Sequence, residues 1–121
     1  MPAIPAFMLK KLYVKGSLSN VEGGFQLSLK NTLAPGTIVG FKPLVVDGRE
    51  YPPERITVTS GAKSVSAHEI GPDRPYPFPV GGMATVHVSG EPLAAGEHAL
   101  TIAVETREVG ELKIEVSDSL S

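Results

Sequence analysis

The 121-residue chain contains no cysteine and no tryptophan. Without thiols there can be no disulfide bond, no thiolate nucleophile and no zinc site built on cysteine. The fold therefore does not depend on an oxidising compartment, and we expect a cytoplasmic location. The first residues lack the basic and apolar regions of a signal peptide, and no run of about 18 apolar residues occurs. We expect neither export nor a membrane span.

Aromatic residues are also scarce, at 6% of the chain, and the net charge is only -2. The lysines of the first half are not interleaved with aromatic residues, so the pattern typical of nucleic-acid binding is missing. Hydrophobic residues nevertheless make up 41% of the chain. A chain of this length and composition is expected to fold as one domain around one core.

The clearest strand signal covers residues 96–105, where apolar and polar residues alternate, and the same period returns in residues 111–116. A three-residue loop, 108–110, with Gly110 in the left-handed bulge position joins the two as a hairpin. The expected cross-strand pairs are Val104–Ile114, Ile102–Val116 and Glu105–Lys113.

The same alternation predicts strands in residues 12–18, 25–29 and 84–88. Residues 37–46 are apolar on both faces, which predicts a central strand or one that faces the partner sheet. Asp47-Gly48 predicts a tight turn after it. That turn would pair Val46 with Arg49 and Leu44 with Tyr51. With no credible helix, about eight or nine short strands predict an all-β, single-domain antiparallel sandwich, immunoglobulin-like or jelly-roll-like.

The expected organisation is a flexible N-terminal extension in residues 1–8, the sandwich in residues 9–118 and a C-terminal tail in residues 119–121. Patterned sequence begins only after Met8, so that methionine is an alternative native start.

Residues with catalytic or metal-binding chemistry are isolated from one another. His68, His87 and His98 have no neighbour at metal-ligand spacing, and His87 lies on the polar face of its strand. We expect no catalytic, cofactor-binding or metal-binding residue, and retain His68 and His98 only as a weak candidate polar site. The stretch 60–64 has a faint likeness to a phosphate loop but lacks the order of residues and the following helix.

The proline-rich segment 71–82 is the one stretch whose composition suggests a function. Alternate prolines forbid a helix or a central strand, which predicts a stiff extended loop. Two aromatic side chains on a stiff segment suit a partner contact, whereas a loop that caps the sandwich is the alternative. The candidate partner contact consists of Pro75, Tyr76, Pro77, Phe78 and Pro79.

Several segments together resemble one family, the small β subunit of bacterial C-glycoside deglycosidases. They are residues 9–18, 25–36, 45–48, 76–82 and 93–98. The resemblance implies an accessory β-sandwich subunit in carbohydrate metabolism, within a hetero-oligomer. Its partner would be a larger α subunit with a barrel fold, which carries a divalent metal and the catalytic residues.

Two other roles are open on the residues alone. A free-standing immunoglobulin-like or carbohydrate-binding module would have no catalytic activity, and an enzyme in its own right would need a polar site around His68 or His98. If the chain is the accessory subunit, we expect no activity from it alone, no cofactor in it, and neither nucleic acid nor membrane as a partner.

Overall fold

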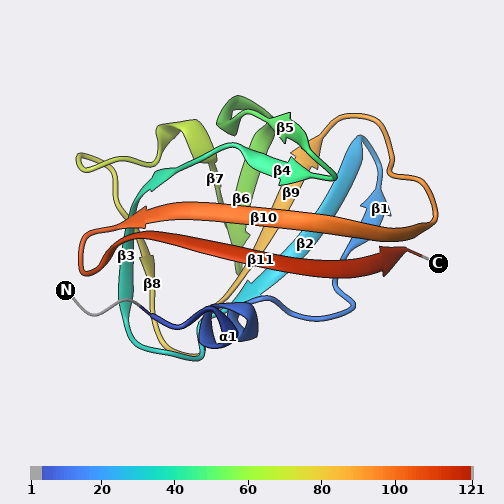
Figure 1. Cartoon of the computed structure of the whole chain (residues 1–121). Coiled ribbons are helices and arrows are strands. Elements are labelled where there is room, and N and C mark those ends of the chain that lie inside the picture. The colour runs from blue at the N-terminus through green and yellow to red at the C-terminus, as the bar shows by residue number, and fades with distance from the viewer. Residues whose placement is uncertain (1–3, 121) are drawn as a thin grey trace.

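A computed structural model describes residues 4–120, which form two antiparallel sheets packed face to face (Figure 1). The first sheet has the strand order β1 (Ser19–Val21), β2 (Gly24–Lys30), β9 (Met83–Ser89), β6 (Ile56–Ser60) and β7 (Lys63–Ser66). The second has the order β5 (Arg49–Tyr51), β4 (Leu44–Val46), β10 (Gly96–Thr106), β3 (Gly36–Phe41) and β8 (Tyr76–Phe78), with β11 (Gly110–Leu120) also paired to β10.

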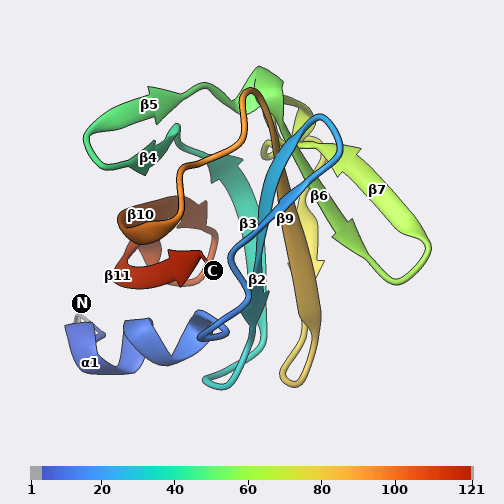
Figure 2. The same ribbon diagram turned by 90° about the vertical axis from the view of Figure 1, so that its right-hand side faces the viewer.

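This architecture confirms the all-β sandwich, with eleven strands in the described residues instead of eight or nine. Figure 2 shows the two sheets as separate layers, and between them lies the core. Its fully buried side chains alternate along the strands, as a half-buried sheet requires. They include Phe25, Leu27, Leu44, Ile56, Val86, Val88, Leu100 and Ile102.

The Asp47-Gly48 hairpin forms as predicted, with Val46 opposite Arg49 and Leu44 opposite Tyr51. Asp47 and Gly48 both have positive φ, at 51° and 86°. This is the turn conformation whose twist matches that of the flanking strands.

The predicted register of the β10–β11 hairpin was wrong by two residues. Ile102 lies opposite Ile114, and Val104 lies opposite Leu112. The turn begins earlier because the Thr106 hydroxyl donates to the Gly110 carbonyl at 2.9 Å and accepts from the Val109 amide at 3.1 Å. A shift of two residues leaves every side chain on its predicted face, so the apolar residues still point inward.

Residues 12–18 do not form the predicted strand. A one-turn helix α1 (Ala6–Leu9) follows Pro5 and continues into the 3₁₀ turn η1 (Lys10–Leu12). The following residues form no strand, and their backbone pairing with a sheet is an isolated bridge from Tyr13 to Leu29. The expectation that the chain contains no helix was therefore also wrong.

A hydrogen-bond network holds this N-terminal segment against β11. The Tyr13 hydroxyl donates to the Asp118 carboxylate at 2.5 Å, and the amides of Gly16 and Leu18 donate to the same oxygen. Burial alone would raise the pKa of Asp118, but the hydrogen bonds from Tyr13, Ser119, Leu18 and Gly16 together lower it. The segment thus closes the sandwich beside β11, where Figure 2 shows α1.

Two further segments differ from their predictions for a reason that involves proline. The expected strand over residues 37–46 is divided into β3 and β4 at Lys42 and Pro43, because proline has no amide hydrogen for the ladder. The proline-rich loop contains β8, which pairs with β3 at the sheet edge, where proline is tolerated. The other 3₁₀ turns are η2 (Pro53–Arg55) and η3 (Ala67–Glu69).

Candidate functional site

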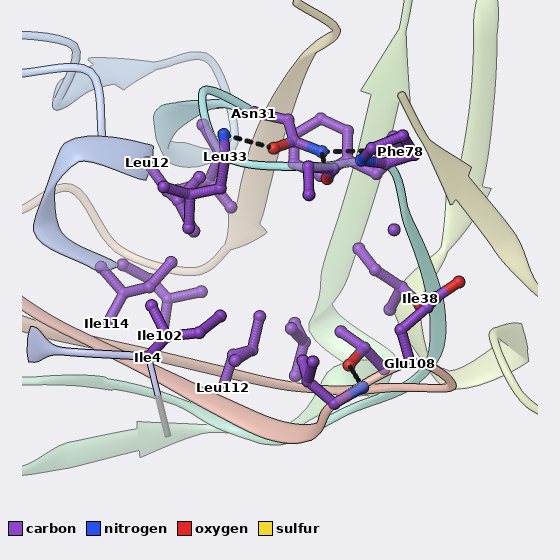
Figure 3. Close-up of a pocket in the computed structure, with 17 residues that line it drawn as sticks. Ile4, Leu12, Asn31, Leu33, Ile38, Phe78, Ile102, Glu108, Leu112 and Ile114 are labelled. Carbon is purple, nitrogen blue, oxygen red and sulfur yellow. Dashed lines mark hydrogen bonds between the residues drawn. The ribbon is translucent and has the colours of Figure 1, made fainter. Parts of the chain in front are cut away.

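An apolar pocket of about 150 Å³ lies at the end of the sandwich closed by the N-terminal segment. Its walls come from both termini and from the middle of the chain, which the fold brings together (Figure 3). The apolar lining side chains include Ile4, Leu12, Leu29, Leu33, Ile38, Phe78, Ile102, Val104, Leu112 and Ile114.

The register of β10 and β11 determines which of these side chains face the pocket. Ile102 and Ile114 lie opposite each other, and Val104 and Leu112 form the next pair on the same face. Ile102 and Ile114 are buried, whereas Leu112 is only half-buried. Figure 3 shows Ile4 and Leu12 of the N-terminal segment beside Ile102 and Ile114.

Asn31 is a buried polar side chain at this pocket, and its hydrogen bonds are made within the chain. Its Nδ2 donates to the carbonyls of Ala34 and Phe78, at 2.8 and 2.7 Å. Its Oδ1 accepts from the Leu33 amide at 3.1 Å. Asn31 therefore fixes the loop between β2 and β3 against β8 and has little hydrogen-bonding capacity left for a ligand.

The two other polar side chains of the lining, Thr106 and Glu108, are also engaged. Thr106 stabilises the β10–β11 turn through its hydroxyl. The Glu108 carboxylate accepts from the Thr37 hydroxyl at 2.8 Å and from the Thr37 amide at 2.9 Å. These two hydrogen bonds, the one from the hydroxyl first, lower the pKa of Glu108, so the carboxylate is ionised at neutral pH.

This arrangement can bind hydrocarbon but offers little to a polar group. An apolar cavity of roughly 150 Å³ is large enough for a benzene-sized molecule. The ionised Glu108 would repel an anionic head group at the lining, whereas a neutral ligand meets no such penalty.

The predicted partner contact does not form one surface. Phe78 is half-buried and lines the apolar pocket, whereas Pro75, Tyr76 and Pro77 line a second cavity at the edge of the sandwich. Pro79 is exposed beside the turn at Gly82, whose amide donates to the Pro79 carbonyl. A role of these five residues in binding a partner stays a prediction.

The two histidines of the weak candidate site have different partners. His68 is exposed in η3, and its Nδ1 lies 2.7 Å from the Ser66 hydroxyl. His98 is buried, with Nε2 at 2.7 Å from the Ala94 carbonyl and Nδ1 at 2.6 Å from the Asp47 carboxylate. No hydrogen bond or ion pair joins the two histidines within residues 4–120.

Both partners of His98 are hydrogen-bond acceptors, so the ring satisfies them fully only when both nitrogens carry a proton. The Ala94 carbonyl and then the Asp47 carboxylate raise the pKa of His98. The Ala99 amide and then His98 lower the pKa of Asp47. The pair holds the Asp47 turn against the start of β10, which is a structural role.

Between Ile4 and Leu120 no three His, Cys, Asp or Glu side chains lie together in a way that would hold a metal ion. That this chain takes no metal or cofactor stays a prediction, which metal analysis of untagged protein would test.

Sequence reasoning missed the residues that build the apolar pocket. Asn31 lies in a stretch that reads as an ordinary turn, and Glu108 lies in the loop of the predicted hairpin. Two partners of Asn31, Leu33 and Ala34, are near neighbours in the sequence, but its third partner lies 47 positions away, and Glu108 binds a residue 71 positions away. The one available signal was the apolar face of residues 112–116, whose inward direction was predicted.

Comparison with known families gives a different assignment from the resemblance. A family described as the hydroxymethylglutaryl-CoA reductase N-terminal domain matches residues 8–121. The chain belongs to this family. Comparison with curated proteins finds no match.

Membership in the hydroxymethylglutaryl-CoA reductase N-terminal domain family overturns the resemblance to C-glycoside deglycosidases. The predicted role as their accessory β subunit was wrong, and so was the assignment to carbohydrate metabolism. The larger barrel-shaped α subunit is likewise not the expected partner, and the metal implied in it no longer has a basis. The carbohydrate-binding alternative is not supported either. The segments that suggested the resemblance are strand and turn patterns that many all-β domains share.

The helices of this domain are short. None within residues 4–120 is long and apolar enough to cross a membrane.

Proposed function

We propose that this chain is a ligand-binding domain of a hydroxymethylglutaryl-CoA reductase-related protein, and that it binds a small, neutral, apolar molecule. Family membership supports the first part of the proposal. The second part is supported by one observation: the polar side chains of the apolar pocket, Asn31, Thr106 and Glu108, are engaged in hydrogen bonds within the chain.

The energetic argument favours an apolar ligand over a polar one. Removing apolar surface from water contributes about 25 cal/mol per Å². A polar ligand group would lose its hydrogen bonds to water without regaining them from these engaged side chains, at a cost of about 1–3 kcal/mol.

Methyl NMR of protein labelled at Ile, Leu and Val tests the proposal, with benzene as the probe and phenol as its polar counterpart. Benzene should shift the methyl signals of Ile102, Leu112 and Ile114 saturably, and phenol should bind more weakly. No saturable shift with benzene, or equal shifts of methyl groups throughout the core, would contradict it.

Position 112 offers a matched pair of variants on one strand. Leu112 and Leu120 are both half-buried residues of β11 on the same face, but only Leu112 lines the pocket. Leu112→Trp should fill the pocket and reduce benzene binding at least about tenfold, which corresponds to about 1.4 kcal/mol. Leu120→Trp should leave binding unchanged, and an equal loss in both variants would mean that the effect is not specific to the pocket.

An activity assay tests the alternative that the domain is itself catalytic. The isolated chain is expected not to turn over hydroxymethylglutaryl-CoA with reduced nicotinamide cofactors. Turnover that survives Leu112→Trp would assign the chain a different role.

We also propose a cytoplasmic location, on the basis of the cysteine-free sequence, which fractionation of the source cells would test.

A further inference from the structure

A second cavity, of about 440 Å³, lies between the edge strands β7 and β8. We call it the edge cavity. Its polar lining residues are Ser60, Lys63, Arg74 and Tyr76, and its apolar ones include Val65 and Ile70.

Strand pairing places the key side chains on the faces that point between the sheets. Val65 lies opposite the buried Val58, and Lys63, two residues before Val65, lies on the same face of β7 but is exposed at the open end of the strand. Tyr76 lies opposite the buried Ile38 and faces inward from the other sheet. The edge cavity is therefore framed by Lys63 on one sheet and Tyr76 on the other.

The charged lining residues are both cationic. Lys63 makes no ion pair within residues 4–120, and Arg74 approaches Glu69 at 3.6 Å, with both side chains largely exposed. An exposed pair of this kind contributes little, so Arg74 can turn to another anion at small cost.

Tyr76 supplies an independent observation. Its hydroxyl is buried and has no hydrogen-bond partner in the described part of the chain, and the residue is 7% exposed. Buried polar groups are nearly always paired, and an unpaired one is expensive. The hydroxyl has almost no accessible surface, so an anion in the edge cavity meets it only when the adjacent wall shifts; a ligand oxygen that then accepts from it removes that cost.

We propose that the edge cavity binds a small organic anion, a carboxylate or a phosphate ester. The oxyanion interacts with Lys63 and Arg74 and accepts a hydrogen bond from Tyr76, while the apolar part of the ligand packs on Val65 and Ile70. Charge-assisted hydrogen bonds of this type are about twice as strong as neutral ones.

Pro77 in β8 and Pro75 just before it favour a small ligand over an added peptide strand. Pro75 and Pro77 have no amide hydrogen, so the outer edge of β8 is a poor template for strand addition. They also make the wall of the edge cavity stiff, which reduces the entropy lost on binding.

Titration of ¹⁵N-labelled chain with phenyl phosphate and with benzoate tests this inference, and benzyl alcohol is the uncharged control. The two anions should shift the amide signals of residues 60–65 and 74–78 saturably, and added salt should weaken the effect. The stronger of the two identifies the head group. No saturable shift from either anion, or an equal one from benzyl alcohol, would overturn the proposal.

Three single-residue variants separate a specific site from general attraction to positive charge. Lys63→Gln should weaken anion binding about tenfold, and Tyr76→Phe about three- to tenfold. Lys113→Gln removes the same charge from the outer face of β11, away from the edge cavity, and should leave binding unchanged. Equal weakening by Lys113→Gln, or unchanged binding in Tyr76→Phe, would overturn the site.

Tyr76→Phe also checks its own folding. Removal of an unpaired buried hydroxyl should leave the melting temperature unchanged or raise it. A large fall would show that the hydroxyl has a structural partner, which contradicts its assignment to a ligand. This cavity is separate from the apolar pocket, so benzene binding at Leu112 and anion binding at Lys63 can succeed or fail independently.

Discussion

The apolar pocket and the edge cavity bury polar groups in opposite ways. At the apolar pocket, Asn31 makes three side-chain hydrogen bonds to the chain itself. At the edge cavity, the Tyr76 hydroxyl has none within the described residues. A polar group that the chain itself satisfies supports the fold, whereas one left without a partner indicates a place for a ligand.

The apolar walls of the two cavities differ as well. Ile102 is fully buried in the central strand β10, but Val65 is half-buried in the edge strand β7. The apolar pocket is thus an extension of the core, and the edge cavity is a gap at its margin. Each of the following predictions tests one part of this comparison.

The largest effect is expected from Ile102→Ala, which should lower the free energy of unfolding by about 2–5 kcal/mol. The truncation removes buried apolar contacts and enlarges the pocket. Val65→Ala should cost only about 1 kcal/mol, since a half-buried side chain loses less on truncation. Chemical denaturation measures both values, and equal costs would mean that the edge cavity belongs to the core.

Asn31→Ala should be intermediate, with a loss of about 1–3 kcal/mol. The change leaves the Leu33 amide and the carbonyls of Ala34 and Phe78 without their partner. Asn20 provides a matched control, because it binds the amide and carbonyl of Leu93 in the same manner on the exposed surface. Asn20→Ala should cost less than about 0.5 kcal/mol. A small cost for Asn31→Ala as well would show that its hydrogen bonds do not hold the pocket together.

Local chemistry explains which parts of the fold could be predicted. The Asp47-Gly48 turn was correct because two neighbouring residues determine its geometry. The faces of β10 and β11 were correct because apolar side chains repeat every second residue. Their register was wrong because the side chain of Thr106 sets the turn, and this contact is not visible in the apolar pattern.

Long-range contacts explain the errors. Residues 12–18 alternate like a strand, yet Tyr13 is held by Asp118, 105 positions away. The apolar pocket could not be predicted from the sequence for the same reason, since its walls come from segments far apart in the chain. Phe78 was singled out because it is an aromatic residue in a proline-rich segment. Neither its place in the apolar pocket nor its contact with Asn31 could be foreseen.

The smallest expected effect is the pH dependence of stability that comes from a third buried polar group, His98. Unlike the Tyr76 hydroxyl, the His98 ring has two hydrogen-bond acceptors, Asp47 and Ala94. Folding raises the pKa of His98 above its ordinary value of 6.5. Its contribution to stability is therefore complete below pH 6.5 and is lost as the pH rises through the folded-state pKa. Asp47 has the opposite sign: folding lowers its pKa, so its contribution is complete above the ordinary value of 3.8 and is lost at lower pH.

The contribution of this pair to the melting temperature should accordingly be highest between about pH 4 and pH 6.5, and should fall modestly as the pH rises above 6.5. The effect is modest because the Asp47 side chain is 49% exposed and solvent screens the pair. His98→Gln should abolish this contribution to the fall above pH 6.5. Asp47→Asn should only reduce it, because the Ala94 carbonyl, the larger cause of the shift, remains. If His98→Gln leaves the alkaline slope unchanged, His98 is not protonated in the folded chain, and its hydrogen bonds to Asp47 and Ala94 do not both form.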